Sequence, residues 1–404
     1  MNTPPDNVIP AQVATSSADG ASVSPQKKKP RNSNLELYRV IVMLLIVAHH
    51  FVVNSGLMGE LHAIPHEVTA SGYAMILFGG WGKIGINCFV LITCYFMCKS
   101  RITLGKFVKL YLQIVLYALV IDLIFMYTGH IEINIKSIAA YFMHFLPVTG
   151  LYQNFVGCFL VFWLCIPFLN VLVQHLTKKQ HALLTILLVV FFTILPFNPK
   201  YRVNLDYLEW FTVLYLMASF IRFYEADFSR ISHKAWGWLM LASLLLASSS
   251  MLVPAWLWTV HVTNSLVPYY FVMDSNMIFA VVVSITSFMW FKDLKIKQSN
   301  IINTAGAATF GVLLIHANSN AMRLWLWNET VDVVGHYRSL SAPMMALYAV
   351  AVVLLIFTVC ACIDTARQRW LEPHINPRVE ALLSRGWKRI SGKLQGAGAD
   401  KANS

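Results

Sequence analysis

Two ionisable residues, Arg39 and His50, lie eleven positions apart in a largely apolar stretch near the start of the chain. The stretch 35–51 reads LELYRVIVMLLIVAHHF. In an α-helix, eleven steps of about 100° bring the second side chain to within roughly 20° of the first, about 16 Å further along the axis. The guanidinium could hold an anionic donor, and the imidazole could take and return a proton. Alternatively, Arg39 reaches the lipid headgroups and His50 only hydrogen-bonds within a helical bundle.

Other apolar stretches also contain polar side chains, which are costly to bury in a membrane. His316 lies about thirteen residues into its stretch, at a depth similar to that of His50. The two histidines could therefore share one cavity, although a packing role for His316 is equally open. Buried carboxylates and amides could orient a histidine or bind sugar hydroxyls, or could instead form local pairs and caps. The candidates are Asp122, Asp274 and Asn276.

The elements that must position these residues are membrane-spanning helices. A helix needs roughly 20 apolar residues to cross the hydrocarbon core, and ten segments approach that length. They are 36–54, 72–98, 106–128, 152–174, 181–197, 208–224, 234–254, 266–290, 303–322 and 343–363. A further stretch, 136–147, is expected to lie along the interface. The pattern predicts an all-α fold, a polytopic membrane bundle of about ten transmembrane helices.

The composition agrees with a membrane protein. Of the 404 residues, 57% are hydrophobic and 12% charged, whereas soluble domains carry about 25% charged residues. The net charge of +12 does not indicate nucleic-acid binding, because the basic residues occupy short gaps between apolar runs. The seven cysteines are expected to be packing residues, and no spacing typical of metal ligands is present.

The basic residues also predict the orientation. With the N-terminus inside, 24 of the 31 Lys and Arg residues fall on the inner side and 5 on the outer side. This asymmetry predicts a multi-pass protein of the cell membrane with both termini cytoplasmic. Residues 1–34 are polar and end in a basic run, so we expect a disordered tail there. The membrane domain is expected over 35–365, followed by a basic cytoplasmic tail over 366–404.

The spacing of Arg39 and His50 resembles the first-span motif of the acyltransferase-3 family, which comprises integral membrane acyltransferases that include polysaccharide O-acetyltransferases. The stretch 85–96, GINCFVLITCYF, is similar to a second family motif, with Thr93 in place of Ser and Cys94 in place of Gly. The endings TFGVLLIH at 309–316 and IPFLN at 166–170 are also similar. Asn154 departs from the family, because many members have Trp there, although it remains a candidate substrate contact. The resemblance covers about residues 34–363.

The resemblance implies a coenzyme A thioester, most simply acetyl-CoA, as the acyl donor. Many members have two arginines near the start of the third span, thought to hold the phosphates of coenzyme A; here Lys106 and Lys109 occupy that spacing. Arg101 and Arg39 would add positive charge for the same donor. Lysine retains the charge but lacks the bidentate fork of arginine. Ordinary positive-inside flanking explains the lysines equally well.

Together with the residues above, the resemblance implies a membrane O-acyltransferase that moves an acyl group to a hydroxyl of an extracytoplasmic polysaccharide or lipid-linked glycan. No metal is expected. His50 would act as a base or would itself carry the acyl group, and the sequence leaves both open. A proton-coupled transporter or flippase would also explain buried His, Arg and Asp residues. A non-catalytic membrane scaffold is a third interpretation, but it leaves Arg39 and His50 without a role.

Overall fold

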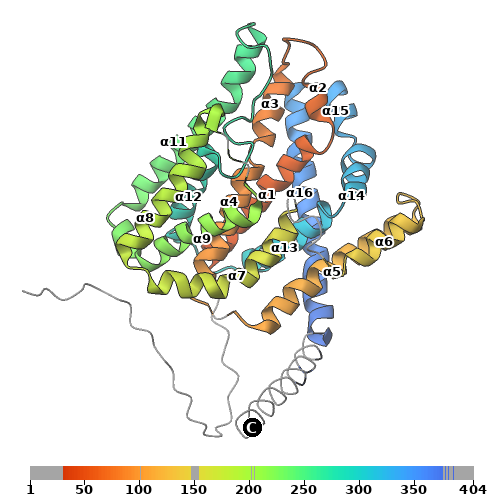
Figure 1. Ribbon diagram of the computed structural model, residues 1–404. Helices are drawn as coiled ribbons and strands as arrows, with labels where there is room; N and C mark the ends of the chain where they lie inside the picture. Colours follow the sequence, from red (N-terminus) through yellow and green to blue (C-terminus); the bar gives the residue numbers. More distant parts are fainter. Residues whose placement is uncertain are drawn as a thin grey trace, which may run out of the picture.

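The computed structural model describes residues 31–100, 102–146, 154–201, 203, 205–375 and the single positions 378, 381 and 385. Arg101 and most of both predicted tails lie outside these residues. The elements of the described part are all helices (Figure 1). The fold is therefore an all-α polytopic bundle, as the sequence predicts.

The long helices follow the predicted apolar segments. The first half of the chain contributes α1 (Ser33–Val53), α3 (Ala70–Gly79), α4 (Gly82–Met97), α5 (Leu104–Tyr127), α6 (Ile135–Met143), α7 (Phe155–His175) and α8 (Lys178–Val189). The second half contributes α9 (Tyr207–Phe223), α11 (His233–Thr259), α12 (Ile278–Lys292), α13 (Asn300–His316), α14 (Asn320–Leu324), α15 (Val333–Ser339) and α16 (Ala342–Ala366). The short helices α2 (Leu57–Glu60) and α10 (Glu225–Phe228) lie in connections.

Seven helical stretches of the described chain are long and apolar enough to cross a membrane, or eight if a bent pair counts as one span. The segment expected at 266–290 becomes helical only at Ile278, because Pro268 and several polar residues precede it. The resulting helix α12 has 15 residues, and α9 has 17. Both are shorter than a typical span.

Helix α1 lies at the centre of the bundle. It packs against α3, α4, α13 and α16, and α4 in turn packs against α9 and α12. The approach of α4 to α1 requires glycine, since a Cβ on Gly85 would lie 2.8 Å from the Ile46 side chain. A Cβ on Gly82 would overlap the ring of His49. These close approaches hold the histidine-bearing part of α1 in a fixed position.

The segment expected as one span at 303–322 is broken directly after His316. Helix α13 ends at His316, and the helical segment that starts at Asn320 is bent from it by 94°. Asn318 caps the break through its side-chain amide, which donates to the Leu314 carbonyl at 3.1 Å. The break therefore presents polar residues at the depth where a continuous helix would present an apolar turn.

Helices α5 and α6 lie at one side of the bundle (Figure 1). Helix α6 overlaps the stretch expected at the interface, and none of its residues is buried. Its C-terminal end returns to α5, where the Tyr111 hydroxyl donates to the Phe145 carbonyl at 2.7 Å. The end of the bundle that carries Ser33 is called the inner end, in accordance with the orientation predicted from the basic residues, and the opposite end is called the outer end.

Candidate functional site

Two histidines from different helices, the half-buried His50 and the buried His316, meet inside the bundle. The Nδ1 atom of His50 on α1 lies 2.9 Å from the Nε2 atom of His316 on α13, and the ring centroids are 5.1 Å apart. Both helices begin at the inner end, where the Ser33 hydroxyl lies 2.9 Å from the Asn303 carboxamide oxygen. Parallel packing from this common start places the two imidazoles at the same depth.

The hydrogen bonds fix the tautomer of each neutral ring. The Nδ1 atom of His316 lies 2.6 Å from the Val312 carbonyl oxygen, which can only accept, so Nδ1 carries the hydrogen. The Nε2 atom of His316 is then an acceptor, and the His50 Nδ1 must donate to it. The hydrogen of neutral His50 therefore resides on Nδ1, and its Nε2 keeps a lone pair. This arrangement suits an imidazole that receives a proton at Nε2.

His50 lines a cavity of about 710 Å³, here called the main cavity. Residues of α1, α4, α5, α6, α7, α9 and α13 form its walls. From α1, Met43, Ile46 and His50 contribute; this spacing marks a single helix face. His316 is almost fully buried, with 1% of its surface exposed, and it stands behind His50 and not in the wall. It is therefore placed to orient His50.

A second imidazole, that of His144, lines the main cavity from the end of α6. Its Nε2 atom lies 2.6 Å from the Asp122 carboxylate on α5. Asp122 is buried, and its Oδ1 atom has no hydrogen-bond partner among the described residues. The carboxylate orients the ring and accepts its Nε2 hydrogen. Asp122 thus contacts His144, which lines the main cavity, and is placed to orient that histidine.

The break after α13 places a cation, two carboxamides and a hydroxyl in the wall of the same cavity. Asn318, Ser319, Asn320 and Arg323 all line it. The Nε atom of Arg323 is buried without a hydrogen-bond partner among the described residues. A guanidinium with spare donors at a cavity wall can stabilise negative charge that develops on a bound molecule. Asn154 also lines the main cavity and caps α7, accepting from the Val156 amide at 3.0 Å.

Arg39 does not line the main cavity. It forms an ion pair with Glu36 at 2.8 Å, and its guanidinium lies 5.8 Å from the centroid of the Phe96 ring. Met43, four residues further along α1, marks the inner limit of the cavity on this helix, which is about 6 Å from Arg39 along the axis. The predicted pair thus shares a helix face, but only His50 reaches the cavity.

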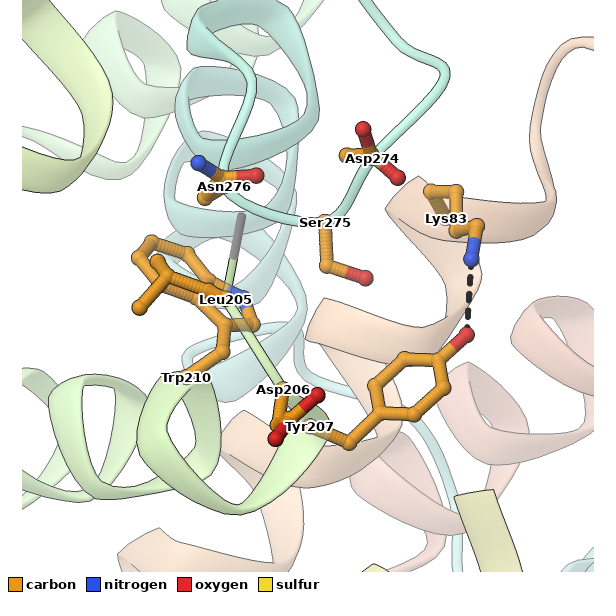
Figure 2. A pocket seen from close by; sticks show the side chains of 8 residues that line it. All are labelled: Lys83, Leu205, Asp206, Tyr207, Trp210, Asp274, Ser275 and Asn276. Atoms are coloured by element: carbon orange, nitrogen blue, oxygen red, sulfur yellow. Dashed lines mark hydrogen bonds between the residues drawn. The ribbon is translucent and has the colours of Figure 1, made fainter. Parts of the chain in front are cut away.

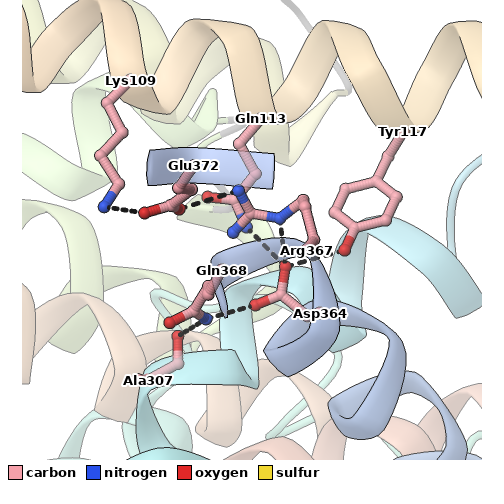
Figure 3. Close-up of polar contacts among 8 residues, drawn as sticks. All are labelled: Lys109, Gln113, Tyr117, Ala307, Asp364, Arg367, Gln368 and Glu372. Atoms are coloured by element: carbon pink, nitrogen blue, oxygen red, sulfur yellow. Dashed lines mark hydrogen bonds and ion pairs between the residues drawn. The ribbon is translucent and has the colours of Figure 1, made fainter. Parts of the chain in front are cut away.

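Lys109 belongs to a charged network at the inner end of α5 and α16 (Figure 3). Its Nζ atom lies 2.5 Å from the Glu372 carboxylate, and Glu372 also accepts from Arg367 at 2.8 Å. Arg367 donates in turn to Asp364 at 2.8 Å, which is fully buried. Lys106 lies one turn earlier on α5, and Arg101 lies outside the described residues. Lys109 is about 7.5 Å along α5 from Ile114 in the cavity wall.

Asp274 and Asn276 line a different cavity, here called the outer cavity, of about 220 Å³ (Figure 2). Its other walls come from the outer ends of α4 and α9. Tyr207 lines both cavities, so the two lie next to each other. Asn276 is buried and donates to the Phe192 carbonyl at 2.8 Å.

Sequence reasoning did not single out several residues of the main cavity, among them His144, Arg323 and Tyr207. His144 follows an amphipathic interfacial segment, and its pairing with Asp122 depends on how α6 folds back. Arg323 directly follows the segment expected at 303–322, and a straight helix through that segment would leave it as one of the five basic residues that flank the spans on the outer side. The polar run Asn318, Ser319 and Asn320 directly after His316 was the available signal for the break.

Among the described residues, no group of three or more His, Cys, Asp or Glu side chains could hold a metal ion.

The fold and the cavity define a class of protein: a membrane-embedded helical bundle with paired histidines beside an internal cavity that is lined by apolar and polar side chains. The model of the acyltransferase-3 family, described as an acyltransferase domain, matches residues 32–365. The chain belongs to this family and is a membrane acyltransferase. No curated protein and no solved structure matches it.

Proposed function

We propose that the chain is an O-acetyltransferase that takes the acetyl group of cytoplasmic acetyl-CoA and transfers it to a hydroxyl of an extracytoplasmic polysaccharide or lipid-linked glycan. The observation that carries this proposal is the hydrogen bond from His50 to His316 beside the main cavity. This hydrogen bond leaves the Nε2 atom of His50 with a lone pair, as a general base requires. Membership of an acyltransferase family favours this activity over the transporter alternative.

The cavity supports a donor that enters from the inner end. Arg39 and Lys109 carry positive charge within about two helical turns of the innermost cavity residues on α1 and α5. Coenzyme A is anionic at its nucleotide end and carries the acyl group on a long, thin arm. The cations would hold the nucleotide end, and the arm would extend past Met43 to His50. Glu36 and Glu372 already pair with these cations, so donor phosphates would compete with carboxylates.

The proposed transfer step conserves the acceptor proton, which passes through His50 to the leaving group. His50 Nε2 takes the proton of the acceptor hydroxyl, and the hydroxyl oxygen bonds to the thioester carbonyl carbon. The resulting oxyanion is stabilised by Arg323, which lines the same cavity. The carbon–sulfur bond then breaks, and the departing thiolate takes the proton from His50. His316 stabilises the transient imidazolium, because its Nε2 accepts the His50 Nδ1 hydrogen throughout.

Inside-out membrane vesicles that contain the chain, supplied with acetyl-CoA labelled in its acetyl group, test the proposal. We expect label in the glycan fraction that mild alkali releases as acetate, as an ester requires. His50→Ala should abolish this label, because a general base contributes about 10²–10⁴-fold and its removal leaves the hydroxyl unactivated. His175→Ala, a change at an exposed histidine at the inner end of α7, is the matched control and should keep full transfer.

The same experiment separates a base from a nucleophile. If protein incubated without acceptor retains label that is absent from His50→Ala, His50 carries the acetyl group covalently and the function stands with a changed mechanism. Full transfer by a folded His50→Ala protein would refute the proposed chemistry.

A further inference from the structure

The outer cavity contains an unsatisfied hydroxyl. Ser275, which precedes α12, has 6% of its surface exposed and lines this cavity. Its Oγ atom has no hydrogen-bond partner among the described residues. A buried hydroxyl without a partner destabilises the protein unless a ligand or water forms a hydrogen bond with it. Figure 2 shows it directed to the side of the cavity where Lys83 meets Tyr207.

The wall that carries Ser275 is held in place from behind. Asn87 on α4 is fully buried; its amide donates to the Ser275 carbonyl at 2.7 Å. The Asn87 carboxamide oxygen accepts from the Trp210 indole at 2.8 Å, so one side chain fixes the backbone of Ser275 and the ring of Trp210. On the other side, the Lys83 ammonium donates to the Tyr207 hydroxyl at 2.7 Å. The cavity is therefore a built site and not a gap left by loose packing.

The side chains of the outer cavity suit a sugar. Carboxylates, an amide and a hydroxyl offer hydrogen bonds to ligand hydroxyls, and they come from Asp206, Asp274, Asn276 and Ser275. The rings of Tyr207 and Trp210 supply apolar surface beside these polar groups, as is usual in small-molecule sites. The volume of about 220 Å³ accommodates a single sugar unit and not a chain.

The charge of the lining selects among sugars. Among the described residues, the charged groups that line the outer cavity are two carboxylates, from Asp206 and Asp274, and one ammonium, from Lys83, which donates to Tyr207. A ligand that carries its own carboxylate or phosphate would meet like charges at close range, and such juxtapositions disfavour binding. A neutral, hydroxyl-rich unit meets no such repulsion.

We propose that the outer cavity binds one neutral sugar unit of the acceptor, adjacent to the unit that is acetylated in the main cavity. This inference rests on the proposed function and names the substrate class of its acceptor side. Tyr207, shared by the two cavities, marks the junction between the two units. The outer cavity would thus select among glycans through a sugar unit that is not itself acetylated.

The test measures saccharide binding directly, so that it does not depend on catalysis. Calorimetric titration of the purified full chain in detergent uses maltotetraose as the neutral probe and tetragalacturonate as the anionic probe. We expect maltotetraose to bind and tetragalacturonate to bind at least tenfold more weakly. Ser275→Ala should weaken maltotetraose binding about two- to thirteenfold, because one hydrogen bond contributes about 0.5–1.5 kcal/mol.

Stability separates a binding role from a structural one. Since the Ser275 hydroxyl is unpaired among the described residues of the free protein, Ser275→Ala should leave the melting temperature unchanged or raise it. A structural serine would lower it. Ser229→Ala, a change at an exposed serine near α10, is the control for both measurements. Equal binding of the two saccharides, no binding of maltotetraose, or unchanged affinity in Ser275→Ala would overturn the inference.

His50→Ala distinguishes this inference from the proposed function, because it should bind maltotetraose as the unchanged protein does while transferring no acetyl group. Acetyl transfer without saccharide binding would refute only the role of the outer cavity. Saccharide binding that depends on Ser275, together with full transfer by His50→Ala, would refute only the proposed chemistry.

Discussion

The polar cluster at the inner end and the polar cluster around the main cavity are built in different ways. In the inner network, Asp364 accepts hydrogen bonds from Gln113, Tyr117, Arg367 and Gln368, and Arg367 has a second carboxylate partner in Glu372. Around the main cavity, Arg323 and Asp122 each retain a buried atom without a partner among the described residues, and His50 has one hydrogen bond, to His316.

This difference separates a structural cluster from a chemical one. A buried charge is tolerated when every donor and acceptor around it is used, and Asp364 meets that condition between three helical segments. Groups that must bind a substrate cannot be fully satisfied by the protein, since their hydrogen bonds are reserved for the ligand or the transition state. Of the incompletely paired groups, Arg323 lines the main cavity and Asp122 reaches it through His144. The fully paired network instead closes the contact between α5, α13 and α16 (Figure 3).

The largest expected effect is the loss of folding stability when the inner network is broken. Asp364→Ala leaves Arg367 buried with reduced compensation, and removing one partner of a buried pair costs about 3–5 kcal/mol. Thermal unfolding in detergent should show a strong decrease for Asp364→Ala. Asp293→Ala removes an exposed carboxylate that pairs with Lys292 and should change little. Equal stability of the two variants would remove the structural role assigned to the inner network.

The next largest effect concerns the cation at the main cavity. Arg323→Gln should lower kcat about 10²–10³-fold, as expected for the loss of one group that stabilises an oxyanion. The melting temperature should change little, because the Nε atom of Arg323 is unpaired among the described residues of the free protein. Arg338→Gln alters an exposed arginine at the outer end and serves as the control. A drop in stability without a drop in kcat would place Arg323 with the structural cluster.

A smaller effect is expected at His316, which acts through His50. A hydrogen bond to a charged group contributes about 1.5–3 kcal/mol, so His316→Phe should lower kcat about ten- to hundredfold. KM for the acyl donor should stay unchanged, because His316 does not line the main cavity. His316→Gln can still accept the His50 Nδ1 hydrogen and should restore most of the activity. Equal losses in both variants would indicate packing alone.

Sequence reasoning reached the parts of this architecture that depend on helical periodicity. Counting residues from the span starts placed His50 and His316 at one depth, because both helices are continuous up to those residues. It could not place His144 or Arg323, whose positions depend on a fold-back and on a break of 94°. It also missed the pairing of Lys109 with Glu372, since an ion pair between the third span and the C-terminal segment has no local signature.

The smallest effect is expected at Lys109 and Glu372. It decides whether Lys109 belongs only to the inner network or also binds the donor. The pair is half exposed on the lysine side, so its loss should cost only about 0–1 kcal/mol of stability. If Lys109 holds a phosphate of the donor, this phosphate and the Glu372 carboxylate compete for the Lys109 ammonium. Lys109→Ala should then raise KM for acetyl-CoA severalfold, whereas Glu372→Gln should lower it, because the lysine is released while a hydrogen bond to Arg367 is retained. Initial-rate kinetics at varied acetyl-CoA measure both. If both variants change KM for acetyl-CoA in the same direction, Lys109 belongs to the structural network. Breaking a purely structural ion pair has the same effect whichever partner is replaced.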